Sequence, residues 1–392
     1  MARIEAIRAN FGPSVEGLAF RLRNPAHMAV SGYLTIEPDQ AVKPVSDIGW
    51  TPALVEYEKH AAYRELIDRA PLKLRLEALA IFGVSMARLL LKRLIKYEFI
   101  PYDVRTDRSV GGRLRFAGAA LRNMVRGDAR SRRLSAVEAD AGKIARHGIH
   151  VVTMPADRFA ALEEASRAEF DRLAARRGHS NGQRRFEESR GQASRAEQRE
   201  LFDVIETTLR EAGVLDVASA YLGRRAGLID VNPQINDTSD TFWRDIFPDA
   251  ELKTLPPTAY CHRDASGGDL KAIIYMTDVD DRTGPFSYVV GSNRMKIDRL
   301  DDLICEANDS NGLAGTDALS RARFAALPAK LRQKGAFGND LTPDSALGRE
   351  IGQGLWAVKA GKGSIVLFDT KGIHRGGMVE EGERRVITCV IG

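Results

Sequence analysis

Cysteine is scarce in this chain of 392 residues, which holds only Cys261, Cys305 and Cys389, in no paired spacing. Neither a disulfide framework nor a cysteine-based zinc site is indicated. Long apolar runs are lacking too, because the longest uncharged one, at 78–87, is about half the length of a membrane span. The first residues show no apolar core with a small-residue cleavage site, so no secretory signal is expected. We therefore expect a soluble, cytoplasmic protein.

Charge is unevenly distributed along the chain, although the formal net charge is only +5. The stretch from Lys73 to Arg133 holds fifteen Lys or Arg against five Asp or Glu, and its net charge is +10. Such a stretch fits an anionic partner, namely a phosphate-bearing substrate, an acidic carrier protein or a membrane surface with which the protein associates peripherally. Nucleic acid fits less well, because aromatic residues are sparse among these arginines. A solvated, arginine-rich helical surface is the equally good alternative.

Helical periodicity dominates residues 1–140, for which we predict a basic, mainly helical N-terminal region. Apolar residues recur at helical spacing over 72–100, with Arg and Lys between them. The pattern returns over 114–125, after the Gly111-Gly112 breaker.

Short strands dominate the second region, 141–392. A strand at 150–153 is followed by helices near 156–170, 197–212 and 215–222, with an exposed polar loop at 178–198. After Gly227, strands separated by Gly, Pro and Asp turns favour an antiparallel sandwich or barrel; they lie at 228–235, 258–262, 270–277, 286–290, 364–369 and 384–391. The stretch at about 295–350 is helical in pattern and predicts a lid insertion.

Two short motifs carry histidine and aspartate in positions that suit a metal ion. His262 and Asp264 are two residues apart on an expected strand, so their side chains point to the same face. In GSIVLFDTKGIHRGG a buried strand runs into a glycine-rich turn that presents His374. Two imidazoles and one carboxylate can occupy one face of an octahedral iron(II) and leave three positions open. Each motif alone also fits an ordinary surface or turn residue, and their joint occurrence favours the metal site.

An arginine pair follows the second histidine. Arg384 and Arg385 stand ten and eleven residues after His374, at the start of the last apolar strand. A dicarboxylate such as 2-oxoglutarate needs a fixed, bidentate cation of this kind. Neighbouring side chains on a strand point to opposite faces, so only one of the two can serve. Asn232 and Gln234, on the strand at 228–235, are further candidates for cosubstrate or substrate contacts.

Two segments resemble the halves of a phytanoyl-CoA dioxygenase-like catalytic core, a family of Fe(II)/2-oxoglutarate-dependent oxygenases. They are CHRDASGGDLKAIIYMTDVDDRTGPFSYVVGSNR and GSIVLFDTKGIHRGGMVEEGERRVITCVIG, and the resemblance spans roughly 142–392. Thr283, Val290 and Asn293 replace the Asn, Pro and His of the family pattern, outside the expected ligands.

The resemblance implies an α+β fold whose core is a double-stranded β-helix, of the jelly-roll or cupin-like type. It also implies Fe(II), 2-oxoglutarate and O2, with His262, Asp264 and His374 as both catalytic residues and metal ligands. The register of the last strand places Arg384 on the family's cosubstrate position, whereas the distance from the distal histidine in several relatives selects Arg385.

The expected reaction is hydroxylation of an unactivated C–H bond, with release of succinate and CO2. The substrate would be a small molecule, carrier-bound or lipid-like, and neither its identity nor the oligomeric state follows from the pattern. Asp264 fills the position at which related halogenases carry Gly or Ala. Desaturation and cyclisation start from the same hydrogen abstraction. The alternative from another class is a non-catalytic scaffold or binding protein that uses the basic helical region.

The motif His262-Arg263-Asp264 also begins the catalytic loop of protein kinases. A kinase requires Asn five residues after the aspartate, where this chain has Asp269, and a Gly-rich nucleotide loop upstream, which is lacking. The kinase interpretation is therefore excluded.

Overall fold

Two antiparallel sheets and the helices around them make up the computed structural model. It describes residues 34–38, 42–43, 61–97, 100, 104–105, 107–125, 138–178, 191, 198–238, 261–264, 269–295, 298–309, 318–332 and 346–392. Five parts of the sequence prediction lie at least partly outside these ranges. They are most of residues 1–60 of the N-terminal region, the end of the basic stretch at 126–133, most of the polar loop at 178–198, residues 258–260 of one expected strand, and residues 296–297, 310–317 and 333–345 of the expected lid insertion.

The larger sheet has six strands in the order β1-β2-β7-β4-β9-β3, and every neighbouring pair is antiparallel. Its strands are β1 (Leu34–Ile36), β2 (Ile149–Thr153), β3 (Leu228–Asp237), β4 (Leu270–Tyr275), β7 (Ser364–Asp369) and β9 (Glu383–Ile391). The smaller sheet has the order β6-β5-β8, also antiparallel, with β5 (Ser287–Val289), β6 (Leu355–Ala357) and β8 (His374–Arg375).

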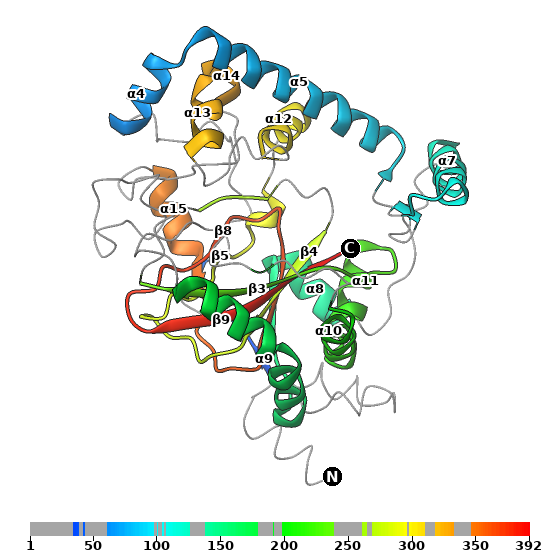
Figure 1. Ribbon diagram of the computed structural model, residues 1–392, viewed down its shortest axis with the longest axis vertical. Coiled ribbons are helices and arrows are strands. Elements are labelled where there is room, and N and C mark those ends of the chain that lie inside the picture. The colour runs from blue at the N-terminus through cyan, green and yellow to red at the C-terminus, as the bar shows by residue number, and fades with distance from the viewer. Residues whose placement is uncertain are drawn as a thin grey trace.

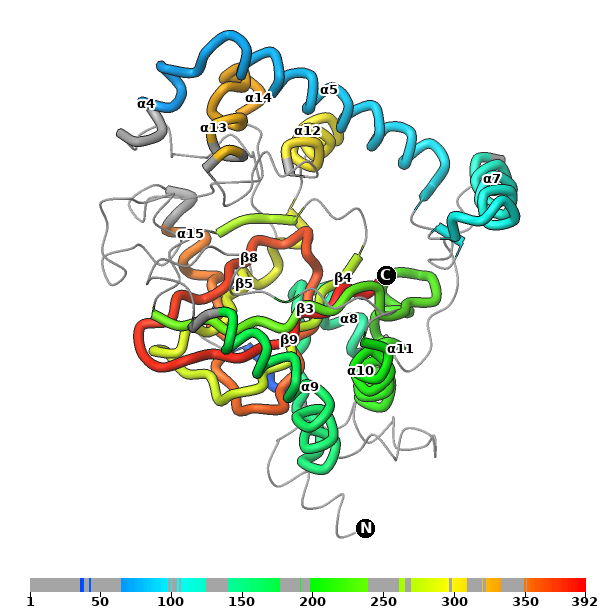
Figure 2. The backbone as a smooth tube through the Cα atoms, viewed as in Figure 1, coloured from blue at the N-terminus to red at the C-terminus, as the bar shows by residue number. Residues whose placement is uncertain are grey.

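The helices fall into two groups around these sheets (Figure 1). One group packs on or beside the larger sheet: α8 (Glu138–His147), α9 (Ala156–Gly178), α10 (Arg199–Glu211) and α11 (Val214–Leu222). In the other group, α15 (Ala346–Gly354) lies beside the smaller sheet and runs directly into β6, and α4 (Ala61–Arg69), α5 (Leu72–Leu94), α12 (Arg299–Asp309), α13 (Ala318–Ala326) and α14 (Ala329–Arg332) lie beyond that sheet. The helix α7 (Val110–Val125) lies beside the end of α5. The backbone trace shows α5 crossing over α13 and α12 before the chain reaches α7 (Figure 2).

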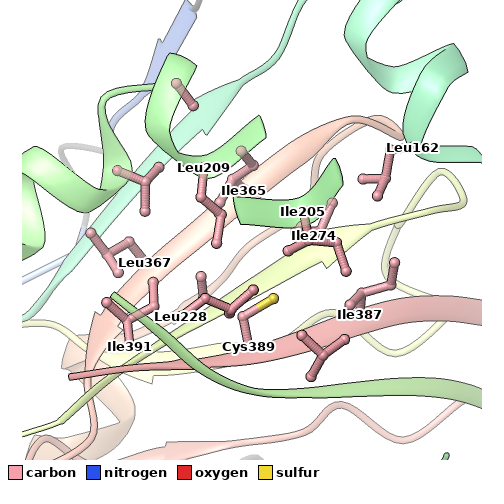
Figure 3. Packing of buried hydrophobic residues seen from close by; sticks show 14 of the residues in the cluster. Leu162, Ile205, Leu209, Leu228, Ile274, Ile365, Leu367, Ile387, Cys389 and Ile391 are labelled. Carbon is pink, nitrogen blue, oxygen red and sulfur yellow. The ribbon is translucent and has the colours of Figure 1, made fainter. Parts of the chain in front are cut away.

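Alternation along the strands gives the larger sheet two different buried faces. On β4, Ala272 and Ile274 pack toward the helices, in a cluster that includes Leu162 of α9 and Ile205 of α10 (Figure 3). Ile273 and Tyr275 point the other way, into a second cluster. It joins Val366 and Phe368 of β7 and Val386 of β9 to Tyr288 of β5 and to Phe286 and Val358, which lie next to the smaller sheet's strands. The space between the two sheets is therefore lined by alternate residues of each long strand.

The structure confirms the mixture of helices with antiparallel strands and the two expected helices, with different ends. The helix α5 ends at Leu94 rather than near residue 100, and α7 begins at Val110, so Gly111 and Gly112 lie within its first turn and do not break it. The strands expected at 150–153, 228–235, 270–277, 286–290, 364–369 and 384–391 are present with slightly different ends. The sequence did not predict β1, which pairs with β2 from within the expected N-terminal region. Three residues are too few to carry a periodic signal.

Candidate metal centre

The structure brings His262, Asp264 and His374 together, as the sequence pattern predicts. One ligand atom from each lies within 4.8 Å of the others, and no second group of this kind occurs in the described residues. Asp264 lies between the imidazoles, with its Oδ1 3.6 Å from His262 Nε2 and its Oδ2 3.7 Å from His374 Nε2. Three carboxylate or imidazole donors converge on one point.

Backbone hydrogen bonds hold the two motifs in register. The amide of His262 donates to the carbonyl of His374 at 2.9 Å, and the amide of His374 donates back at 2.8 Å. The amide of Asp264 donates to the carbonyl of Thr370 at 3.0 Å. Because these bonds join the main chains, the spacing of the donors does not depend on side-chain contacts alone.

The turn before His374 fixes the direction of its ring. Its Nδ1 lies 2.9 Å from the carbonyl oxygen of Gly372, which leaves Nε2 directed at Asp264. A Cβ at position 372 would collide with the hydroxyl of Tyr288, which donates to the carbonyl of Asp369 at 2.9 Å. The glycine of this turn is thus required by a close approach of the Tyr288 ring.

The protonation states suit a metal ion. Burial lowers the pKa of His374 to about 3, despite the neighbouring carboxylate of Asp264, so its imidazole is neutral at pH 7. Burial is the largest single effect on Asp264 and would raise its pKa, but the Lys271 ammonium and the two neighbouring histidines together hold that pKa well below its usual range. A neutral imidazole with a free Nε2 lone pair and an ionised carboxylate are the forms that bind metals. The residues present therefore fit a divalent ion.

Lys271 is a site residue that the sequence interpretation missed. Its Nζ lies 2.5 Å from Oδ2 of Asp264, and its side chain is partly buried. It occupies β4 in alternation with Ile273 and Tyr275, so it faces the space between the sheets. The sequence offered one indication of this role: Lys271 is the only charged residue in the otherwise apolar strand LKAIIY.

Arg263, between His262 and Asp264, points away from them and anchors their segment to α12. It is buried, its guanidinium lies 3.5 Å from Oδ1 of Asp302, and it donates to the carbonyl of Lys371. A weaker contact joins it to Cys305 Sγ at 3.9 Å. The ligand segment is thereby joined to the helical insertion.

The two candidate arginines lie on opposite sides of β9. Arg384 is 6% exposed, lies on the strand face of Val386 and donates to Asn236 Oδ1 at 3.2 Å. Arg385 bonds to Glu383 at 2.6 Å and lies over the ring of Phe170 of α9, on the helix-covered side. Only Arg384 therefore faces the side on which the two sheets meet.

The other candidates lie on β3, beside β9. Gln234 donates to Thr388 Oγ1 at 3.1 Å, and Asn232 donates to Asp230 Oδ2 at 2.9 Å. They alternate with residues that pack against the helices, so they share a face with Asn236. Asn236, the partner of Arg384, was not among the sequence candidates although the same alternation indicates it.

Comparison with known proteins adds distant likenesses only. No protein-family model matches the chain, and no curated protein matches it. Among solved structures, the chain is similar to SnoK, a non-heme alpha ketoglutarate dependent carbocyclase from nogalamycin biosynthesis, with 14% identity over 65% of this chain and 83% of SnoK, at a TM-score of 0.39.

Two further structures contain bound ligands. EctD from S. alaskensis with bound Fe is 14% identical over 65% of this chain and 75% of EctD, with a TM-score of 0.38. HygX from Streptomyces hygroscopicus, with nickel and 2-oxoglutarate bound, is 15% identical over 65% of this chain and 86% of HygX, with a TM-score of 0.37. Iron and 2-oxoglutarate, expected from the sequence resemblance, thus occur in matched structures. Likenesses of this size specify neither a reaction nor a substrate.

Proposed function

We propose that the chain is an Fe(II)/2-oxoglutarate-dependent oxygenase whose two sheets form a double-stranded β-helix. The observation that carries the proposal is the convergence of His262, Asp264 and His374 within 4.8 Å of one another. Two imidazoles and one carboxylate form the facial set typical of non-haem iron(II) oxygenases, which keeps three positions for other ligands. The buried Arg384 supplies the cation that a dicarboxylate cosubstrate needs.

Each residue of the site has a distinct part in this proposal. His262, Asp264 and His374 hold the iron, and iron supplies the activation of O2 that accompanies oxidative decarboxylation of 2-oxoglutarate. Arg384 binds the far carboxylate of the cosubstrate, and Asn236 orients its guanidinium through the 3.2 Å hydrogen bond. Gln234 and Asn232 offer amide groups on the neighbouring strand for further contacts.

Hydroxylation of an unactivated C–H bond is the reaction that we propose. Asp264 supports it, because a carboxylate at this position occupies the place that a halide would need. Desaturation and cyclisation begin from the same abstraction of a hydrogen atom from the substrate, and they are alternative outcomes on a suitable substrate. A small-molecule, carrier-bound or lipid-like substrate is compatible with the site.

Cosubstrate binding tests this proposal without a known substrate. Titration calorimetry would follow 2-oxoglutarate added to the protein with Fe(II) in the absence of O2. We expect binding that depends on the metal, is strongly weakened by Arg384→Ala and is little changed by Arg385→Ala. Absence of metal-dependent binding would contradict the proposal and favour the non-catalytic scaffold instead.

A further inference from the structure

The helix α5 turns an apolar face to solvent. Leu72, Leu76, Leu90 and Leu94 are all more than half exposed, and helical spacing places them within one narrow arc. Small residues, including Gly83, lie between them on the same arc. The opposite face carries the buried residues Ala78, Ser85 and Leu89 and packs against α12 and α13.

The shorter helix α7 repeats this arrangement. Val110, Leu114 and Leu121 lie on one arc and are 77%, 70% and 60% exposed. Its opposite face packs against the segment that follows α5, in a small cluster of Ile95, Ile100, Val104, Phe116, Ala119 and Ala120. That contact joins α7 to the end of α5, on the outer edge of the molecule (Figure 1).

Basic residues border both apolar stripes. On α7, Arg113 lies on one side of the stripe, and Arg115 and Arg122 lie on the other. Lys73 lies at one edge of the α5 stripe. Residues 72–125 hold eleven Lys or Arg and four Asp or Glu. Arg115 pairs with Asp107, but within the described residues Lys73, Arg113 and Arg122 form no ion pair.

We propose that the outward sides of α5 and α7 form a docking surface for an anionic lipid bilayer. This lipid-docking face comprises Leu72, Leu76, Leu79, Leu90, Leu91, Leu94, Val110, Leu114 and Leu121 with the basic residues beside them. Transfer of these nine exposed apolar side chains from water to the boundary between headgroups and acyl chains is favourable. The flanking cations would form electrostatic contacts with anionic headgroups.

The charge pattern favours lipid over the other occupants of an apolar face. A second copy of the chain would bring two strongly basic surfaces together, and they would repel each other. Nucleic acid would leave the leucines exposed to water. No helix in the described ranges is long and apolar enough to cross a membrane, so these helices would lie in the plane of the interface.

The lipid-docking face is joined to the candidate metal centre by a short series of ion pairs. Nη2 of Arg93 on α5 lies 3.4 Å from Oδ2 of Asp302 and 3.1 Å from Oε2 of Glu306, and both acids are on α12. Asp302 also pairs with Arg263, which stands between His262 and Asp264. Docking would thus hold the centre in a fixed orientation relative to the lipid surface, although the docking itself does not depend on the proposed chemistry.

Vesicle sedimentation of the full chain tests the proposal. We expect binding to phosphatidylcholine vesicles that contain phosphatidylglycerol and much weaker binding to phosphatidylcholine alone. Added salt should weaken the binding, because it shortens the Debye length below about 8 Å. Arg113→Gln with Arg122→Gln should weaken it by about fivefold for each charge removed. Leu76→Glu with Leu90→Glu should weaken it by about tenfold for each leucine.

Leu319→Glu on α13 is the matched control, since this leucine is 53% exposed but lies outside the lipid-docking face. It should bind vesicles like the native chain, and thermal unfolding should show that all variants are folded. Native protein that does not sediment with anionic vesicles would overturn the proposal. Self-association without lipid that is lost in the Leu76→Glu, Leu90→Glu variant would also overturn it, in favour of a dimer interface.

Discussion

Arg384 and Arg385 are neighbours on β9, yet one donates to Asn236 and the other lies over Phe170 on the opposite side of the sheet. Arg384→Ala should therefore raise the KM for 2-oxoglutarate about tenfold to a hundredfold, because a charge-assisted bidentate pair contributes about 1.5–3 kcal/mol. Arg385→Ala, the matched control, should leave it nearly unchanged. Steady-state kinetics would show this, and the opposite ranking would move the cosubstrate position to Arg385.

Lys271→Met should weaken iron binding about tenfold or more, which is the usual effect of removing a partner that orients a metal ligand. Methionine keeps much of the length of the side chain but removes the hydrogen bond to Asp264 Oδ2. Lys271→Arg should restore much of the affinity, because it keeps a cation at the carboxylate. Competition with a chelator would measure the affinities. Tighter metal binding in Lys271→Met would show instead that repulsion between the ammonium and the ion dominates.

The metal-free protein should lose stability as the pH falls below about 6.5. Burial lowers the pKa of His374 to about 3 in the folded state, so the unfolded chain binds more protons than the folded chain between these two values. The free energy of unfolding should then decrease with falling pH, by up to about 1.4 kcal/mol per pH unit from this group. The depressed pKa of Asp264 adds a loss only at lower pH, below about 3.9.

Denaturant unfolding at several pH values would measure this dependence. His374→Phe removes the titrating group, so its unfolding free energy should fall less steeply between about pH 6.5 and pH 4.5. Equal slopes for the native protein and this variant would mean that other groups govern the acid sensitivity.

Local sequence patterns were sufficient to predict that His262, Asp264 and His374 lie together, and to predict much of the fold. His262 and Asp264 are two residues apart on an extended segment, so their side chains are expected on the same face. The glycine-rich turn after the strand at 364–369 indicated that His374 is presented at the end of that strand. The same alternation predicted that Arg384 and Arg385 point apart. These inferences need only the alternation of side chains between the two faces of a strand, which repeats every two residues.

Contacts between distant elements could not be predicted in this way. The approach of Lys271 to Asp264 depends on where β4 lies relative to the His262–Asp264 segment, and the pair of Arg263 with Asp302 depends on where α12 packs. On α5, periodicity showed an amphipathic helix but not which side meets the protein. The buried side carries Ala78 and Ser85, which form a weaker apolar signal than the leucines that remain exposed.

The most direct test of the central claim is succinate formation from 2-oxoglutarate by the purified protein, with Fe(II) and O2 supplied and removed in turn. The account predicts turnover that requires both, even without the true substrate, and that is lost in Asp264→Ala together with iron retention. Near-native turnover in Asp264→Ala without added chloride or formate, or no succinate from the iron-loaded native protein, would contradict it.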